Sequence, residues 1–232
     1  MAGEQHIKPL TVSVFGDKKV GKTSLIRRFL GQSFSRHHHP TVEDYYEEEI
    51  IRETNRCRQL RILDTTGSYD FPAMRKIAIN KSEAFVLVYS LDDPKSFEKL
   101  KWHREEILKY KNNNKVPIVV VCNKTDLTDI AALQEILKNT DEILPAISEQ
   151  LKKQKKIIVE DWGCKLMFTS AKVRWNINKV FYELVALQEK GSDNNIEISQ
   201  QRRRSSLWHH IVCSKSHSQR PKGIVRTRSF SA

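Results

Sequence analysis

One short stretch constrains what this 232-residue chain can fold into more than any other. The residues Gly16-Asp-Lys-Lys-Val-Gly-Lys-Thr23 fit the pattern G-x-x-x-x-G-K-[ST] of a phosphate-binding loop. An apolar run at 10–15 precedes the loop and a helix-forming run at 24–30 follows it, which is the setting the motif requires. Glycines let the backbone point successive N–H groups at one phosphate, and the helix N-terminus adds its positive end. The alternative is a strand-to-helix turn that binds nothing.

Two side chains of this loop have defined roles if it binds a nucleotide. Lys22 would reach the β- and γ-phosphates, and the Thr23 hydroxyl would ligate Mg²⁺.

The length and charge of the chain predict one domain with extensions. A hydrophobic content of 39% is sufficient for the core of an α/β domain of about 170–190 residues. The net charge is +12, but 190–232 holds nine Lys or Arg against two acidic residues and so carries +7 of it. We expect a flexible N-terminus at 1–9, a folded domain at 10–190 and a basic, disordered tail at 191–232.

The four cysteines are far apart and form no C-x-x-C pair, which favours neither a disulfide framework nor a zinc site and suits a reducing cytosol. The N-terminus has no apolar signal segment, and no apolar run approaches the ~18–20 residues of a membrane span, so we expect a soluble protein. Three consecutive histidines at 37–39 suggest a metal site, but adjacent side chains of an extended loop diverge, and a solvated loop is the preferred interpretation.

Apolar runs and helical patterns alternate along the chain. Strands are expected at 10–15, 46–52, 57–63, 84–90, 116–122 and 165–170, and helices at 24–30, 71–79, 94–110 and 176–189. The second and third strands form a hairpin. Between the last two strands, 127–160 is longer and more helical than one crossover requires: one apolar face precedes Pro145, a second helix follows it, and 152–156 is a charged, solvated stretch. The pattern predicts a mostly parallel six-stranded α/β sheet with helices on both faces.

Three further motifs follow predicted strands, where the ligands of such sheets bind. The carboxylate of Asn123-Lys-x-Asp126 can accept the N1 and N2 protons of guanine, a donor pair that adenine lacks. Ser170-Ala-Lys172 can offer a backbone N–H to guanine O6, and Asp64-Thr-Thr-Gly67 supplies a carboxylate for magnesium.

Together these motifs resemble those of the Ras-like small GTPases over residues 10–189, and the segment 64–75 is similar to the Di-Ras branch in particular. The resemblance implies the P-loop NTPase (small G-protein) fold and a guanine-nucleotide switch in signal transduction that uses GTP/GDP and Mg²⁺. It also implies that Phe34 lies against the guanine ring, that Thr41 binds Mg²⁺ and senses the γ-phosphate, and that Gly67 is the pivot of switch II.

The residues so assigned to nucleotide binding are Gly16, Asp17, Lys18, Lys19, Val20, Gly21, Lys22, Thr23, Ser24, Phe34, Thr41, Asp64, Gly67, Asn123, Lys124, Asp126, Ser170, Ala171 and Lys172. Thr23 and Thr41 are the expected metal ligands, with Asp64 one layer further out. The effector loop for partner and regulator proteins is Pro40, Thr41, Val42, Glu43 and Asp44.

Two departures from the family pattern concern catalysis. Active Ras proteins have a glutamine after the switch II glycine to orient the attacking water, and here that residue is Ser68. The loop position that admits an arginine finger when it is glycine is Lys18. With Lys22 as the remaining catalytic residue, we expect a weak GTPase with very slow hydrolysis that is mostly GTP-bound. The alternative is a GTP-stabilised interaction module, a pseudo-GTPase without meaningful turnover.

Two more departures concern the outline of the domain. Asp126 and Ser170 are 44 positions apart, so 127–160 is interpreted as a helical insertion that nucleotide binding does not need. The end, Ser229-Phe-Ser-Ala232, has no C-a-a-X cysteine, and Cys213 alone is a weak palmitoylation signal. We expect a cytoplasmic protein with at most weak, salt-sensitive attraction to the inner face of the plasma membrane. No nucleic acid is expected, because no aromatic residues are interleaved with the basic ones.

The tail carries one further hypothesis. Arg228 stands three residues before Ser231, and Arg203-Arg-Ser205 is an upstream kinase-type sequence. Phosphorylated, these serines resemble the ligands of 14-3-3 proteins. A disordered basic tail with incidental serines is the alternative.

Overall fold

The computed structural model describes residues 9–35, 43–51, 57–67, 71–112, 115–128 and 147–191. All the elements below belong to one unit, residues 1–189, except that the last helix continues to 191. Within the described ranges, no helix combines the length and the apolar character needed to cross a membrane.

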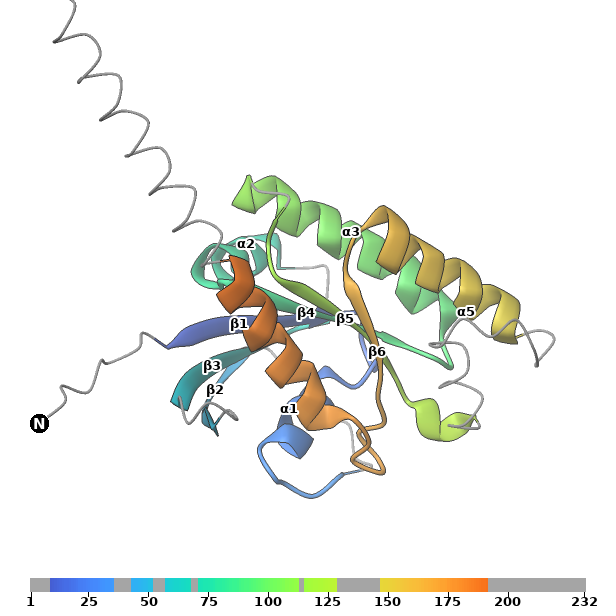
Figure 1. Ribbon diagram of the computed structural model, residues 1–232, viewed down its shortest axis with the longest axis horizontal. Helices are drawn as coiled ribbons and strands as arrows, with labels where there is room; N and C mark the ends of the chain where they lie inside the picture. The colour runs from blue at the N-terminus through green and yellow to red at the C-terminus, as the bar shows by residue number, and fades with distance from the viewer. Residues whose placement is uncertain are drawn as a thin grey trace, which may run out of the picture. The chain divides into compact units, whose positions relative to one another are not determined.

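A six-stranded sheet forms the centre of this unit (Figure 1). Its strands are β1 (Leu10–Gly16), β2 (Glu43–Ile51), β3 (Cys57–Thr65), β4 (Ala84–Ser90), β5 (Ile118–Asn123) and β6 (Lys165–Phe168). They lie in the order β2-β3-β1-β4-β5-β6, in which β2 runs antiparallel to β3 and every other neighbouring pair is parallel. The predicted fold class, a mostly parallel six-stranded α/β sheet, is confirmed.

Helices connect the strands and cover the sheet (Figure 1). They are α1 (Lys22–Phe29), α2 (Pro72–Lys81), α3 (Pro94–Lys111), the 3₁₀ turn η1 (Thr125–Leu127), α5 (Ile147–Lys156), the π turn η2 (Ile157–Asp161) and a last helix at 177–191. Proline occupies the first turn of both α2 and α3, where the missing N–H has no intrahelical partner to lose.

Side-chain alternation along the strands divides the core into two layers. On β1, Val12 and Val14 pack in one cluster with α1 and the last helix, whereas Phe15 packs in a second cluster with α2, α3 and α5. Strands β4 and β5 are buried throughout, as expected of central parallel strands covered on both faces. Helices on both faces of the sheet are therefore confirmed.

Two element boundaries differ from the sequence expectation in ways that matter for the site. Strand β3 continues to Thr65, because the Thr65 hydroxyl donates to the Val14 carbonyl at 2.7 Å, so Asp64 lies on the strand and not after it. Strand β6 ends at Phe168, and Ser170 instead pairs with Trp175 across a tight turn.

The structure corrects the expectation that all of 127–160 is an addition to the fold. Leu151 on α5 and Ile158 on η2 are 3% and 0% exposed and belong to the same core cluster as Phe97 of α3. The stretch 152–156 is therefore not simply solvated: it forms the end of α5, and Gln154 within it is buried. Residues 147–161 are the helical cover between β5 and β6, and 129–146 lie outside the described residues.

Candidate functional site

The sequence motifs meet at one edge of the sheet, where the parallel strands end. Gly16 ends β1, Asp64 lies near the end of β3, Asn123 ends β5, and Ser170 follows β6. Because parallel strands share the direction of their carboxyl ends, motifs far apart in sequence are brought together there.

The loop Gly16–Thr23 needs its glycines for close packing. A Cβ on Gly16 would lie 2.1 Å from the Val88 carbonyl oxygen, and one on Gly21 would lie 2.3 Å from the Asn123 amide nitrogen. Gly21 also has a φ of 97°, in the left-handed region. Side chains at these two positions would push the loop away from β4 and β5.

Lys22 closes the loop from inside. Its ammonium donates to the carbonyl oxygens of Gly16 at 3.1 Å and Asp17 at 2.9 Å, and the side chain is buried. Burial lowers the pKa of Lys22 from 10.5 to about 8, against the opposing influence of the Asp64 and Asp17 carboxylates. A phosphate placed in the loop would supply the negative charge that favours the protonated amine.

Thr23 and Asp64 form a pair suited to magnesium. The Thr23 hydroxyl donates to Asp64 Oδ2 at 2.6 Å, and Asp64 is fully buried. A hydroxyl beside a carboxylate is the oxygen donor set that Mg²⁺ prefers, with phosphates and waters completing its shell. No cluster of three or more His, Cys, Asp or Glu occurs among the described residues, and Thr41 and the histidines at 37–39 lie outside them.

Asn123 joins the phosphate loop to the loops after β5 and β6. Its amide nitrogen donates to the Val20 carbonyl at 2.9 Å. Its oxygen accepts from the Thr169 hydroxyl and from the Ala171 N–H, both at 3.2 Å. With the residue 1% exposed, these three bonds fix the relative positions of three loops.

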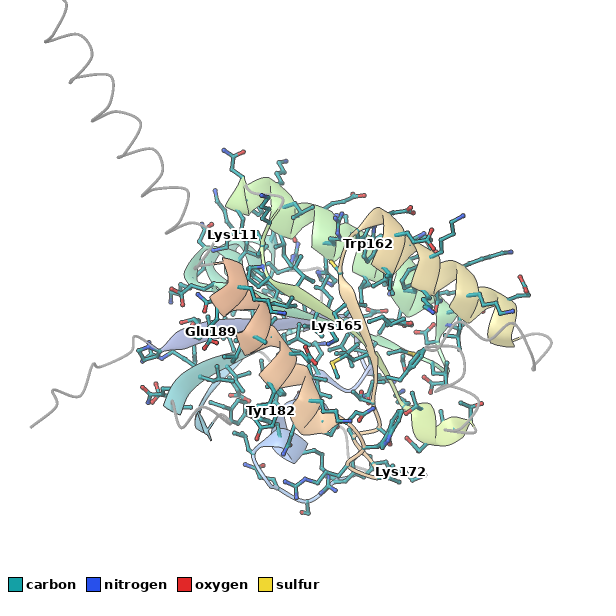
Figure 2. All side chains as sticks on the ribbon, in the orientation of Figure 1. Lys111, Trp162, Lys165, Lys172, Tyr182 and Glu189 are labelled. Atoms are coloured by element: carbon teal, nitrogen blue, oxygen red, sulfur yellow. The ribbon has the colours of Figure 1, made fainter. Side chains whose placement is uncertain are left out.

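Asp126 is held ready as a hydrogen-bond acceptor. Its carboxylate accepts from the Ser170 hydroxyl at 2.6 Å and lies 3.3 Å from the Lys172 ammonium, on the loop after β6 (Figure 2). Burial would raise the pKa of Asp126, but the Ser170 and Lys172 contacts outweigh it and keep the pKa below its usual range. The group is therefore an ionised acceptor at neutral pH.

Three site residues were missed by sequence reasoning. The Asp92 carboxylate lies 3.1 Å from the Lys124 ammonium. The Thr169 carbonyl accepts a hydrogen bond of 2.8 Å from the Thr125 hydroxyl. The Lys99 ammonium, on α3, lies 2.6 Å from the Asp17 carboxylate. Thr169 directly follows β6 and Asp92 lies two residues after β4, so the rule that ligands bind at strand ends could have found them. Lys99 lies on the predicted helix 94–110, where no motif or strand end distinguishes it from the other lysines.

Gly67, the predicted pivot of switch II, lies against the phosphate loop. A Cβ on this glycine would stand 2.6 Å from the Lys18 backbone nitrogen and 2.7 Å from its Cα. Lys18 and Lys19 are both exposed, and Lys19 adopts a φ of 63°. Ser68, which follows Gly67, lies outside the described residues.

The switch I residues are only partly described. Phe34 is 36% exposed. Asp44 stands opposite Asp64 in the β2–β3 register and is exposed, and Glu43 begins β2. Pro40, Thr41 and Val42 lie outside the described residues, as does Cys213.

Comparison with known proteins decides the family. The family model described as "Ras family" matches residues 11–190, well over half of the chain. The chain belongs to the Ras family. Similar proteins include GTP-binding protein Di-Ras2 of Macaca fascicularis, 36% identical over 180 residues that cover 77% of this chain and 81% of that protein. GTP-binding protein Di-Ras1 of Mus musculus is 34% identical over 196 residues, covering 84% and 88%. This Ras-family chain is thus a small GTP-binding protein of the Di-Ras type, as its sequence motifs predicted.

Proposed function

We propose that this Ras-family protein is a guanine-nucleotide switch in signal transduction that hydrolyses GTP very slowly and is mostly GTP-bound. The observation that carries the proposal is that an exposed lysine, Lys18, stands in the phosphate loop where Gly67 packs against the loop backbone. The residues proposed to hold the nucleotide lie together at the strand ends. At Gly67, by contrast, the neighbouring loop residue is Lys18, and the next residue in the sequence is Ser68 in place of the glutamine that orients the attacking water.

Base recognition belongs to the loops after β5 and β6. The ionised Asp126 accepts the N1 and N2 protons of guanine, and Lys124, held by Asp92, flanks the base. The Ala171 N–H already donates to Asn123, so a bond from this N–H to guanine O6 requires it to share or exchange that partner. Phe34 covers the ring from the switch I side.

The phosphates belong to the loop Gly16–Thr23 and the start of α1, including Ser24. Lys22 exchanges its two carbonyl partners for phosphate oxygens, which stabilises its ammonium form. Thr23 and Thr41 would hold Mg²⁺, with Asp64 one layer further out, and the ion would neutralise phosphate charge when bound.

Catalysis in this protein rests on positioning and charge stabilisation, without a side chain that orients the attacking water. Lys22 and the loop N–H groups stabilise charge on the transferred phosphoryl group, and the serine hydroxyl at 68 is too short to replace a glutamine amide. An exposed lysine at 18 also occupies the approach of an arginine finger. The same two features support the second candidate, a GTP-stabilised interaction module without turnover.

Partner proteins would bind at the outer edge of the sheet. Strand β2 is the edge strand, and Asp44 and Tyr45 on it are exposed, with Tyr45 at 49%. A free strand edge with exposed polar and aromatic side chains suits effector and regulator proteins. The cytoplasmic location, the weak attraction to anionic membrane and the 14-3-3 site at Ser231 rest on the tail, outside the described residues, and stay predictions.

Nucleotide analysis of the protein purified from cells tests the proposal. Heat-released nucleotide is separated by ion-exchange chromatography, and the protein is expected to carry GTP in excess of GDP. A Lys18→Gly/Ser68→Gln variant, purified in parallel, is expected to shift toward GDP. Predominant GDP in the unaltered protein would contradict the proposal.

A further inference from the structure

The phosphate loop of this protein contains a carboxylate, which is unfavourable in a site for a polyanion. Asp17 follows Gly16 directly and is 6% exposed. Its charge acts on Lys22, because it is one of the two carboxylates that raise the Lys22 pKa. A negative charge close enough to raise the pKa of the phosphate-binding lysine is also close enough to repel a phosphate bound to that lysine.

Lys99 on α3 compensates this charge. Its ammonium lies 2.6 Å from Asp17 Oδ2, which is the close contact of a charge-assisted hydrogen bond. The Asp17 side chain is 8% exposed and that of Lys99 is 47% exposed, so the carboxylate is buried and its counter-ion reaches it from solvent. The pair connects the phosphate loop to the first half of α3.

The pair lies where several parts of the site meet. The Asp17 carbonyl oxygen accepts the Lys22 ammonium at 2.9 Å, and its carbonyl carbon would stand 2.8 Å from a Cβ on Gly67. Lys99 also lines an open cavity of about 500 Å³ with Arg75, Glu98 and Trp102. Any shift of Asp17 would therefore move the loop, Lys22 and the switch II pivot together.

We propose that Lys99 is a positioning residue of the nucleotide site: it neutralises Asp17 and fixes the loop, so that a loop containing a carboxylate still accepts a triphosphate. This inference rests on the proposed function. Without the ammonium, the buried carboxylate repels the phosphates, and it repels GTP more than GDP because GTP carries more negative charge.

Equilibrium binding of fluorescent GTP and GDP analogues in the presence of Mg²⁺ tests the inference. Lys99→Met is expected to weaken GTP binding about tenfold and GDP binding less, so that the GTP:GDP affinity ratio falls. Asp17→Ala/Lys99→Met is expected to recover most of the GTP affinity and the ratio, because it removes the charge that needed compensation. Lys99→Arg keeps the positive charge and is expected to bind like the unaltered protein.

Lys101→Met is the matched control. Lys101 lies on the same helix and pairs with the exposed Glu98 at 2.8 Å, away from the phosphate loop, so its loss should leave both affinities unchanged. An unchanged GTP:GDP ratio in Lys99→Met, or failure of the double variant to recover it, overturns the inference. Failure of the unaltered protein to bind guanine nucleotides would instead overturn the proposed function.

Discussion

At the scale of single residues, the site side chains hold one another in place. Asn123 binds the phosphate loop and the loop after β6, and Asp126 is held by Ser170 and Lys172. Because these side chains are already held in place in the folded protein, the entropy cost of ordering them when a nucleotide binds is smaller. The sequence motifs predict these residues as site residues but not their mutual bonds: the motif 170–172 predicts only a backbone N–H for the base, whereas the structure adds a bond from the Ser170 hydroxyl to Asp126.

Replacing Asp126 with Asn should move base specificity from guanine toward xanthine. The change exchanges two acceptors for one acceptor and one donor, and losing two charge-assisted hydrogen bonds would cost about 3–5 kcal/mol of GTP affinity. Calorimetric titration with GTP and xanthosine triphosphate measures both effects. Glu160→Gln, which removes an exposed charge on η2, is the control, and undiminished GTP binding by Asp126→Asn would show that the base lies elsewhere.

The pH dependence of nucleotide affinity should report Lys22. Its pKa of about 8 means that the empty site loses the ammonium as pH rises through 8, whereas bound phosphate keeps it protonated. Affinity should fall by up to about tenfold per pH unit above pH 8, and binding should take up a proton there. Calorimetry at pH 7 and pH 9 in buffers of different ionisation enthalpy measures the uptake. Binding that takes up no proton at pH 9 would contradict this assignment.

At the scale of elements, α5 and η2 show what the sequence predicts and what it does not: the helix after Pro145 is confirmed as α5, but its packing into the core was not expected. The strands and most helices were predictable from their apolar pattern: β4 is a continuous apolar run, and the apolar residues of α3 recur with the helical period of 3.6. In α5, the four lysines at 152, 153, 155 and 156 make the sequence look solvated, although Leu151 and Gln154 form a buried face of the helix. Lysines over most of the surface of a short helix do not prevent its remaining face from being buried.

Truncating Leu151 to Ala should destabilise the domain by about 2–4 kcal/mol, because it leaves a cavity in the core cluster shared with α3. Val159 of η2 is 43% exposed, so Val159→Ala should cost less than about 1 kcal/mol. Urea unfolding of the GDP-bound protein compares the two. Equal effects of the two substitutions would mean that α5 does not support the core.

The stretch 129–146 should be dispensable for GTP binding, whereas 147–161 should be required for folding. Replacing 129–146 with a short Gly/Ser linker keeps the base loop at Asp126 and the covering helix α5, so GTP affinity should stay within about tenfold, or ~1.4 kcal/mol. Deleting 127–160 entirely would uncover Phe97 and its neighbours and should abolish folding. A collapse of GTP affinity in the shorter replacement would show that 129–146 also supports the site.

At the scale of the whole molecule, the residues proposed to bind the nucleotide are distinct from Lys18 and Ser68, the two proposed to slow its hydrolysis. The strand ends bring the phosphate, magnesium and base groups together irrespective of what Lys18 and Ser68 do. The order of motifs along the sequence was sufficient to predict this edge, because parallel topology fixes which ends meet. Contacts between distant elements, such as Asp17 with Lys99, depend on helix placement that no local pattern records.

Single-turnover hydrolysis of GTP by the purified protein with Mg²⁺ tests the central claim most directly. The account predicts a rate below the Ras intrinsic value of about 3–5 × 10⁻⁴ s⁻¹, partly recovered in Lys18→Gly/Ser68→Gln. No turnover over many hours, with GTP still bound, would favour the interaction module over the slow switch. Hydrolysis by the unaltered protein as fast as that of Ras would contradict the account.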